Sequence, residues 1–511
     1  MSIIFNENSK TITLNTTNTS YQMKIGKYGY LFHLYYGKRL NADMSYLIQY
    51  YDRGFSGNPE DAGEDRTFSL DALPQEFPVY GNGDYRDNAF LIKDAAGAFG
   101  CDLRYESHRI DNTKKAIPGL PSAYADKNEI ETLVVTLADK AAAVEVELYY
   151  SVFEKNDVIT RSVAVKNTGN KKLFIDRIMS CSMDILGMDA DFITFNGRHG
   201  NERILERTSL GEAALSIGSR RGTSSHQHNP FFIVCDKKAD EDYGNAYAFM
   251  LLYSGNFMGE GFREQYGSLR LMMGIQPDMF EYPLEPGKVF YSPEAAMSFS
   301  ADGFAELSHS LHNFIKNNII RNPENDGIRP VLVNSWEAAF FDFNSEKILK
   351  LADDAKELGV EMLVLDDGWF GHRDDDCSSL GDWYVNEEKL GCSMGELADR
   401  IHEKGLKFGL WIEPEMISEN SNLYQRHPDW VMKIPNTKPL LSRNQLVLDL
   451  SRRDVIEYIY NTVSEILEKN NIKYIYEVDV DLKDESKIKL NDDVFITPIV
   501  KYQFKIAGKE K

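Results

Sequence analysis

Residues 331–475 alternate between short apolar runs and amphipathic stretches, and this alternation constrains the fold more than any other feature of the chain. Four apolar runs are predicted strands: VLVNSW (331–336), MLVLDD (362–367), LKFGLWI (406–412) and IKYIYEV (472–478). Strands that alternate with helices predict a parallel sheet, whose commonest closed form is the (β/α)8 barrel. Only four such units are visible, so we expect an incomplete barrel.

Amphipathic helices are predicted between these strands. The first spans 345–358, with Gly359 beyond its end, and its predicted inward residues are Ile348, Leu351, Ala352, Ala355 and Leu358. Ser393 and Glu396 form a capping-box pattern for a second helix. A third helix is predicted to open near Ser451.

The first 300 residues have the pattern of antiparallel β-structure. Apolar residues alternate with glutamates over 144–148, as in a half-buried strand. Two further β-rich runs, 158–165 and 172–179, are joined by Asn167-Thr168-Gly169-Asn170, which predicts a hairpin. The expected architecture is a large antiparallel β-sandwich.

These patterns divide the chain into four parts. We expect a β-supersandwich at 1–300, a helical connector at 301–330, the first half of a (β/α) barrel at 331–480 and a divergent tail at 481–511. The five tryptophans (336, 369, 383, 411 and 430) all lie in the barrel part.

Charge and composition exclude some partners. A net charge of −22 argues against nucleic acid and against an anionic membrane, both of which need a basic surface. The first residues have neither the basic nor the apolar region of a secretory signal, and no run of 18 apolar residues occurs. The five cysteines are scattered and include no CxxC pair, so we expect a cytoplasmic protein without a disulfide framework.

Asp366 and Asp367 follow a buried strand directly, so they are predicted to lie where a barrel carries its active site. Carboxylates at this position accept strong hydrogen bonds from sugar hydroxyls. The alternative interpretation of the two aspartates is that one caps a helix and the other is a solvated surface charge. Trp336 and Trp411 end two other strands and suit stacking on a hexose, with core packing as the equal alternative. Arg443 is a candidate for a polyol contact, although an isolated arginine is more often a surface ion-pair partner.

His226-Gln227-His228 has the spacing of a metal-binding pair, but no carboxylates flank it, so a metal site is disfavoured. Gly81-Asn82-Gly83 is predicted to be a turn and does not match a phosphate-binding loop.

Six ordered motifs together resemble the α-galactosidases of glycoside hydrolase family 36. They are NSWEAAFFDF (334–343), VLDDGWFG (364–371), GDWYVN (381–386), GLWIEPEM (409–416), HPDW (427–430) and RNQLVLDLSR (443–452). The segment DRTFSLDALPQEFPVYGNGDYR (65–86) resembles the N-terminal domain of that family. The resemblance implies retaining hydrolysis of terminal α-galactosides through two aspartates, without a metal or organic cofactor.

The same resemblance implies roles for particular residues. Asp366 and Asp367 would hold the galactose hydroxyls, Trp336 and Trp411 would shape the sugar pocket, and Arg443 would bind near the reacting centre. Asp52 would reach the pocket of a neighbouring subunit, because family members are commonly tetramers.

The chain departs from the family after residue 475. The family nucleophile lies in a Lys-Trp-Asp-Met-Asn-Arg motif, but here valine (Val478) occupies the place of that aspartate and Tyr476 the place of the lysine. Asp479 lies one residue beyond the position of the family nucleophile, and on a strand a shift of one residue turns the side chain to the opposite face. The glycine-rich motif of the acid/base aspartate does not occur in the 511 residues. We therefore expect no hydrolysis, and the alternative function is a galactoside-binding or subunit-assembly fragment.

Overall fold

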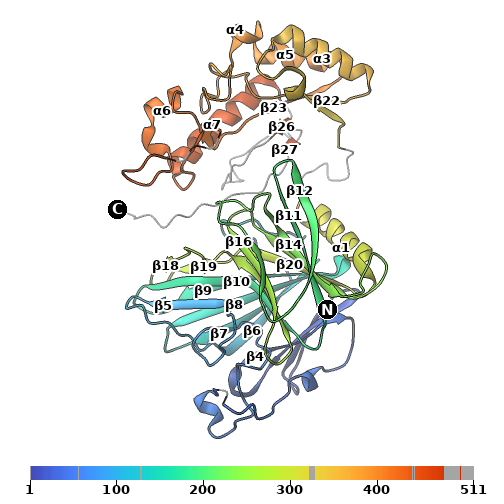
Figure 1. Cartoon of the computed structure of the whole chain (residues 1–511), viewed down its shortest axis with the longest axis vertical. Helices are drawn as coiled ribbons and strands as arrows, with labels where there is room; N and C mark the ends of the chain where they lie inside the picture. The colour runs from blue at the N-terminus through green and yellow to red at the C-terminus, as the bar shows by residue number, and fades with distance from the viewer. Residues whose placement is uncertain are drawn as a thin grey trace. The chain divides into compact units, whose positions relative to one another are not determined.

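The computed structural model describes residues 2–55, 57–126, 129–320, 329–439, 441, 443–472, 474–476 and 495–496. Residues 474–476 and 495–496 are described by their backbone alone. The chain divides between residues 320 and 321 into an N-terminal unit and a C-terminal unit (Figure 1).

The N-terminal unit contains three antiparallel sheets. The smallest holds β1 (Ile3–Asn6), β2 (Thr11–Asn15), β3 (Thr19–Ile25) and β4 (Leu31–Lys38). The six-stranded sheet holds β5 (Phe90–Asp94), β10 (Leu173–Ile185), β13 (Leu215–Gly218), β16 (Phe257–Arg263), β17 (Leu269–Ile275) and β18 (Tyr282–Leu284). The ten-stranded sheet holds β6 (Arg104–Asp111), β7 (Glu131–Asp139), β8 (Val144–Phe153), β9 (Val158–Asn167), β11 (Ala190–Arg198), β12 (Asn201–Ser209), β14 (His228–Asp236), β15 (Ala246–Leu252), β19 (Val289–Tyr291) and β20 (Glu294–Ser300).

One hydrophobic core joins these sheets, as the sandwich prediction requires. It includes Tyr21 from β3, Val146 from β8 and Met183 from β10, all of them buried. In β8 the valines point into this core and the glutamates between them are half-buried, so the predicted period of two is confirmed.

The predicted hairpin at 167–170 is wrong. β9 pairs with β8, β19 and β20, whereas β10 pairs with β5, β17 and β18, so the turn carries the chain from one sheet to the other. The side chain of Asn167 is buried and donates to the carbonyl oxygens of Lys171 (2.7 Å) and Leu284 (2.9 Å). The bond to Lys171 is local, whereas the bond to Leu284 ties the turn to the end of β18, an arrangement that turn propensity alone does not reveal.

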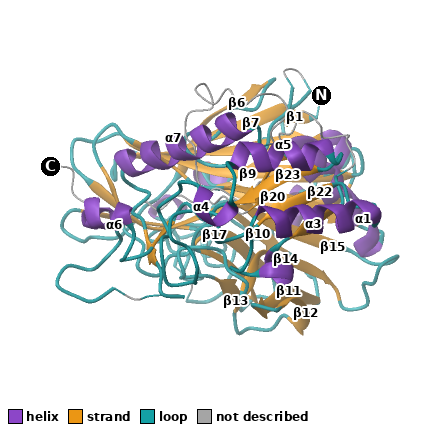
Figure 2. Cartoon of the chain, turned by 90° about the horizontal axis from the view of Figure 1, so that it is seen from above, coloured by secondary structure: helices purple, strands orange, loops and turns teal. Residues whose placement is uncertain are grey.

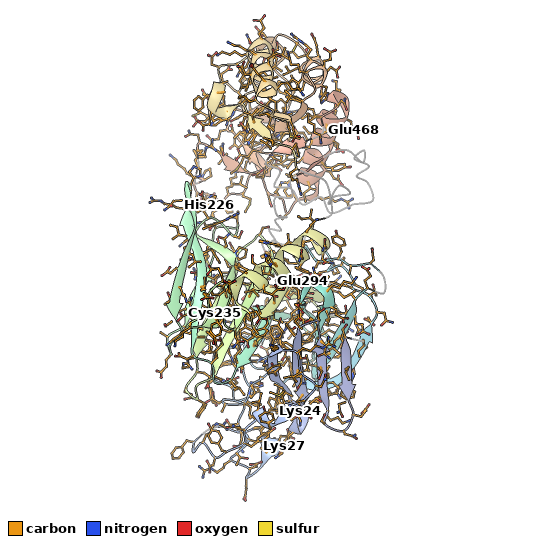
Figure 3. The ribbon with its side chains drawn as sticks, turned by 90° about the vertical axis from the view of Figure 1, so that its right-hand side faces the viewer. Lys24, Lys27, His226, Cys235, Glu294 and Glu468 are labelled. Atoms are coloured by element: carbon orange, nitrogen blue, oxygen red, sulfur yellow. The ribbon has the colours of Figure 1, made fainter. Side chains whose placement is uncertain are left out.

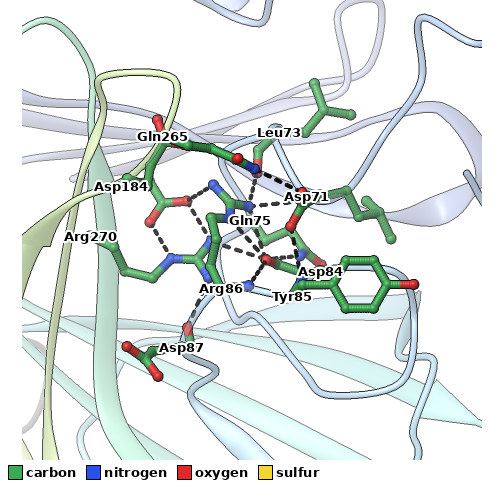
Figure 4. Close-up of polar contacts among 12 residues, drawn as sticks. Asp71, Leu73, Gln75, Asp84, Tyr85, Arg86, Asp87, Asp184, Gln265 and Arg270 are labelled. Carbon is green, nitrogen blue, oxygen red and sulfur yellow. Dashed lines mark hydrogen bonds and ion pairs between the residues drawn. The ribbon is translucent and has the colours of Figure 1, made fainter. Parts of the chain in front are cut away.

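Four charged side chains form a buried network in this unit (Figure 4). Arg270 of β17 donates to Asp184 of β10 (2.8 and 2.9 Å) and to Asp84 (3.1 Å). Arg86 donates to Asp84 (2.8 Å) and lies 3.7 Å from Asp184. Asp84 and Arg86 belong to the 65–86 segment, so the network ties that segment to the six-stranded sheet.

Helix α1 (Gly303–Asn318) packs against the sandwich. It buries Leu307, Leu311 and Phe314, and the Phe314 ring meets the Phe153 ring edge-on at 4.8 Å. The apolar spacing that predicted this helix therefore marks the face that covers the sheet.

The C-terminal unit is built around a parallel sheet. Its elements are β21 (Leu332–Asn334), α2 (Trp336–Ala339), α3 (Ser345–Glu357), β22 (Met362–Leu365), α4 (Glu387–Leu390), α5 (Met394–Glu403), β23 (Lys407–Trp411), β24 (Met416–Ile417), α6 (Asn422–Arg426), β25 (Leu446–Val447), α7 (Arg453–Asn470), β26 (Tyr474–Tyr476) and β27 (Phe495–Ile496). The strand order is β21-β22-β23-β26-β27, and these neighbours are parallel. Helices α3, α5 and α7 lie side by side (Figure 2). This is the first part of a β/α barrel, as predicted.

The predicted helix at 345–358 is confirmed: Ile348, Ala352 and Ala355 are buried, and the half-buried Leu351 packs against the same core. The predicted inward face is wrong at Leu358, which is 82 % exposed, and it omits Leu349, which is buried. Leu358 follows the last helical residue, so it no longer continues the buried stripe. The side chain of Ser393 accepts a hydrogen bond from the backbone of Glu396, which confirms the predicted cap of α5.

β26 is paired on both sides, with β23 and with β27. The residues 477–494 and 497–511 lie outside the described part of the chain, so the predictions for Val478, Asp479 and most of the tail concern residues that the structure does not describe.

Candidate functional site

The carboxyl ends of β21, β22 and β23 meet at one edge of the parallel sheet. Val333 pairs with Leu363, and Leu365 pairs with Leu410, so Asp366 and Trp411 follow two neighbouring strands at the same level. Trp336 begins α2, two residues beyond the end of β21. The structure therefore brings the strand-end residues named from the sequence to a common edge.

Asp366 is fixed by the end of β21. Its backbone N–H donates to the Ser335 hydroxyl (3.0 Å), and one carboxylate oxygen accepts a short hydrogen bond from the Asn334 side-chain amide. The other oxygen accepts the backbone N–H of Asp367 (2.7 Å). The carbonyl oxygen of the Asn334 amide accepts the Trp336 backbone N–H (2.7 Å). The carboxylate of Asp366 is thus held in one orientation at the sheet edge.

Asp367 forms a bidentate ion pair with Arg373. The guanidinium Nε lies 3.0 and 3.1 Å from the two carboxylate oxygens, and Nη2 lies 2.8 Å from one of them. Both side chains are buried. Arg373 also donates to the Ser378 carbonyl oxygen (2.8 Å), and its planar fork holds the carboxylate in a fixed plane.

Adjacent carboxylates in fixed orientations suit the recognition of a polyol. Each ionised carboxylate offers about four acceptor positions, and the hydroxyl groups of a polyol are suitable donors to such acceptors. Charged hydrogen bonds of this kind contribute about 1.5–3 kcal/mol each.

Trp411 is buried in an aromatic cluster. Its ring stacks near Phe370 at 6.3 Å and lies 6.2 Å from Trp383, while its backbone carbonyl oxygen accepts the Trp369 indole N–H (2.9 Å). Trp336 is half-buried and contacts Phe340 and Phe341 edge-on at 5.2 and 5.0 Å. The core-packing alternative therefore describes Trp411 better than Trp336.

Arg443 and Asp52 take no part in the hydrogen bonds and ion pairs given above for Asp366 and Asp367. Arg443 is exposed in a turn where it and Asn444 both have positive φ, and Asn444 bonds the thiol of Cys377 (3.0 Å). Asp52 belongs to the N-terminal unit, where it accepts the Gly54 N–H (2.7 Å) and pairs with Arg66 (3.3 Å).

The sequence reasoning missed Asn334, Ser335 and Arg373. Asn334 and Ser335 stand directly before Trp336, so their position at a strand end was an available signal. Arg373 lies six residues beyond Asp367 in a loop, and no periodicity links the two positions.

A β-sandwich that precedes a parallel β/α sheet with fixed carboxylates and indole rings at its carboxyl edge is typical of glycoside hydrolases. The profile of the glycosyl hydrolase family 36 N-terminal domain matches residues 29–285, and the melibiase profile matches residues 289–492. The chain belongs to glycoside hydrolase family 36, a family of α-galactosidases.

Similar proteins include the bifunctional α-galactosidase/sucrose kinase AgaSK of Mediterraneibacter gnavus, 50 % identical over 475 residues, which are 93 % of this chain and 51 % of that protein. The α-galactosidase AgaA of Geobacillus stearothermophilus is 44 % identical over 477 residues, which are 93 % of this chain and 65 % of AgaA. The chain thus spans about half to two thirds of the length of these relatives.

Solved structures agree with these matches. The galactosidase domain of AgaSK superposes with a TM-score of 0.91 over 93 % of this chain and 66 % of that one. A variant of AgaA in complex with raffinose superposes with a TM-score of 0.89 at 44 % identity, over 91 % of this chain and 65 % of that one. Among the described residues, no helix is long and apolar enough to cross a membrane.

Proposed function

We propose that residues 1–511 recognise the terminal galactosyl group of α-galactosides of the melibiose and raffinose type, and that they do not hydrolyse it. The proposal rests on one observation, the pair Asp366–Asp367, whose orientations are fixed by Asn334 and Arg373 at the carboxyl edge of the sheet. Relatives in complex with raffinose and stachyose support this choice of ligand class.

Within this proposal the other candidate residues keep their predicted roles. Trp336 and Trp411 shape the sugar site, Arg443 contacts the sugar near its anomeric centre, and Asp52 reaches the site of another subunit in a homo-oligomer. The proposed limits of the parts are those read from the sequence: 1–300, 301–330, 331–480 and 481–511. All five cysteines carry free thiols, which suits the reducing cytoplasm, the compartment we propose.

The absence of hydrolysis follows from the residue at the nucleophile position. A retaining glycosidase needs one carboxylate to form a glycosyl-enzyme intermediate, and the Val478 side chain has no nucleophilic atom. Each tenfold in rate corresponds to about 1.4 kcal/mol of activation free energy, and a covalent nucleophile supplies several such steps.

The purified polypeptide 1–511 is expected to release no phenol from an aryl α-galactoside above a mock preparation. The matched control is the Asp366→Ala variant, measured at the same protein concentration. Turnover in the parent that disappears in Asp366→Ala would contradict the proposal, and Asp479 would then be the first residue to test as nucleophile.

The alternative function is a subunit-assembly fragment, which associates with intact subunits without turnover and does not require binding of galactose. A galactose titration therefore distinguishes it from the proposed function.

A further inference from the structure

The N-terminal unit contains a pocket of about 390 Å³ between its two larger sheets. One wall comes from β13, from Met258 of β16 and from Gln276 after β17, and the other comes from His228 at the start of β14. The loop 219–227 contributes Arg220, Arg221 and Gln227 to the lining, and Figure 3 shows His226 of this loop at the end of the unit opposite Lys27. The lining includes Ile217, Gly218, Arg221, Gln227, His228 and Gln276.

The floor of the pocket is closely packed. A Cβ atom at Gly218 would lie 2.5 Å from the Phe257 carbonyl oxygen and 2.9 Å from Nε2 of Gln276, so only glycine fits there. Gln276 is buried, and its Nε2 donates to the same carbonyl oxygen at 3.4 Å. The amide of Gln276 is therefore fixed at the base of the pocket.

The loop is tied to its surroundings by backbone donors. The Gly222 N–H donates to the Asn256 side chain (2.6 Å), and the Ser224 N–H donates to the Ser254 carbonyl oxygen (2.6 Å). The Arg221 N–H donates to the hydroxyl of Ser219 (3.2 Å). These bonds hold the backbone of the loop that carries the exposed side chains of Arg220 and Arg221.

His228 presents a hydrogen-bond acceptor. The amide nitrogen of Asn196 donates to Glu206 (2.6 Å), so the amide oxygen of Asn196 faces His228 Nδ1 at 2.8 Å and accepts its proton. Burial lowers the pKa of His228, so the ring is neutral at neutral pH and Nε2 carries a lone pair.

The pocket carries one uncompensated positive charge. Arg220 is paired with Asp278 through both Nε and Nη2. Among the described residues, the Arg221 guanidinium has no hydrogen-bond or ion-pair partner, and no carboxylate lines the pocket. The guanidinium fork matches a carboxylate or a phosphate in geometry.

We propose that this pocket binds a polyhydroxylated anion, a sugar acid or a sugar phosphate. Arg221 binds the acid group, the amides of Gln227 and Gln276 and the His228 ring bind hydroxyls, and Ile217 and Met258 pack against the apolar face of the sugar ring. The volume lies in the usual range for small-molecule sites. All lining residues belong to the N-terminal unit, so this proposal does not depend on the proposed galactoside site.

Isothermal titration of the polypeptide 1–511 tests the proposal with four probes: galacturonate, galactose 1-phosphate, galactose and inorganic phosphate. We expect at least one of the two sugar anions to bind at least tenfold more tightly than galactose and inorganic phosphate. The tighter sugar anion identifies the acid group as carboxylate or phosphate.

Variants assign the binding to the pocket. Arg221→Gln is expected to weaken the binding of that sugar anion at least tenfold, whereas Arg203→Gln, which removes an exposed arginine of β12, leaves it unchanged. Asp366→Asn must also leave it unchanged, because that residue belongs to the other proposed site. The proposal is overturned if neither sugar anion binds below 10 mM, a limit of about −3 kcal/mol, or if Arg221→Gln binds like the parent. Binding of inorganic phosphate or galactose as tight as that of the sugar anions overturns it equally.

Discussion

Replacement of Arg270 by methionine is expected to lower the free energy of unfolding of the N-terminal unit by about 3–5 kcal/mol. The side chains of Arg270, Asp184 and Asp84 are all fully buried, and the arginine donates to both carboxylates. Loss of the guanidinium leaves Asp184 and Asp84 with Arg86 as their remaining cation nearby. Far-UV circular dichroism during urea unfolding measures the effect, because this unit has no tryptophan.

The matched control is Arg109→Met, which removes an arginine from a partly exposed ion pair with Glu147. We expect a loss of no more than about 1 kcal/mol there. Equal losses in the two variants would show that the buried network does not stabilise the unit more than a surface pair does.

The dependence of stability on acidic pH gives a second measure of the buried network around Arg270. Burial raises the pKa of Asp84, but Arg270 and Arg86 outweigh burial and hold the pKa below its usual value. A carboxyl whose folded pKa is lowered stabilises the fold above its unfolded pKa of about 4, and this contribution is lost as the pH falls through the folded pKa. The difference in stability between the parent and Arg270→Met should therefore shrink below pH ~4.

Replacement of Arg373 by methionine is expected to destabilise the C-terminal unit by about 3–5 kcal/mol, because it leaves the buried Asp367 carboxylate without its cation. The bidentate geometry, with three N–O distances of 2.8–3.1 Å, makes this pair the principal restraint on Asp367. Tryptophan fluorescence follows the unfolding, since every tryptophan lies in this unit.

A second substitution separates two causes of the lower stability of Arg373→Met, the unpaired charge of Asp367 and the lost packing of the arginine. The double variant Arg373→Met with Asp367→Asn removes the unpaired charge, and we expect it to recover part of the lost stability. Arg452→Met, which removes the partly exposed ion pairs of Arg452 with Asp429 and with Asp454, is the control and should have a much smaller effect. If Arg373→Met is as stable as the parent, Asp367 does not depend on this arginine.

The sequence predicted the parts of the fold that depend on local patterns. The alternation in β8, the cap of α5 and the strand ends at Asp366 and Trp411 all follow from the spacing of apolar and polar residues. Side chains at neighbouring strand ends meet in any parallel sheet, so the edge of the candidate site could be predicted without coordinates.

Contacts between distant residues could not be predicted in this way. The residues of the Asn167 turn predict a hairpin because turn propensity is a local property, whereas the Asn167 side chain bonds to the distant Leu284. Arg270 finds its partners 86 and 186 residues away, and Arg373 reaches Asp367 across a loop. Periodicity contains no information on such pairs.

The proposed site at Asp366 and Asp367 is expected to bind galactose in preference to its 4-epimer, glucose. Titration of each sugar against the tryptophan fluorescence of the polypeptide 1–511 tests it most directly, with Asp366→Asn as the site variant and Asp353→Asn, an exposed acid of α3, as the control. We expect galactose to bind with a millimolar dissociation constant, about −4 kcal/mol, and glucose to bind at least several-fold more weakly. The fluorescence response to galactose should be lost in Asp366→Asn and kept in Asp353→Asn. Equal responses to the two sugars, or a galactose response that survives in Asp366→Asn, would show that Asp366 does not select galactose.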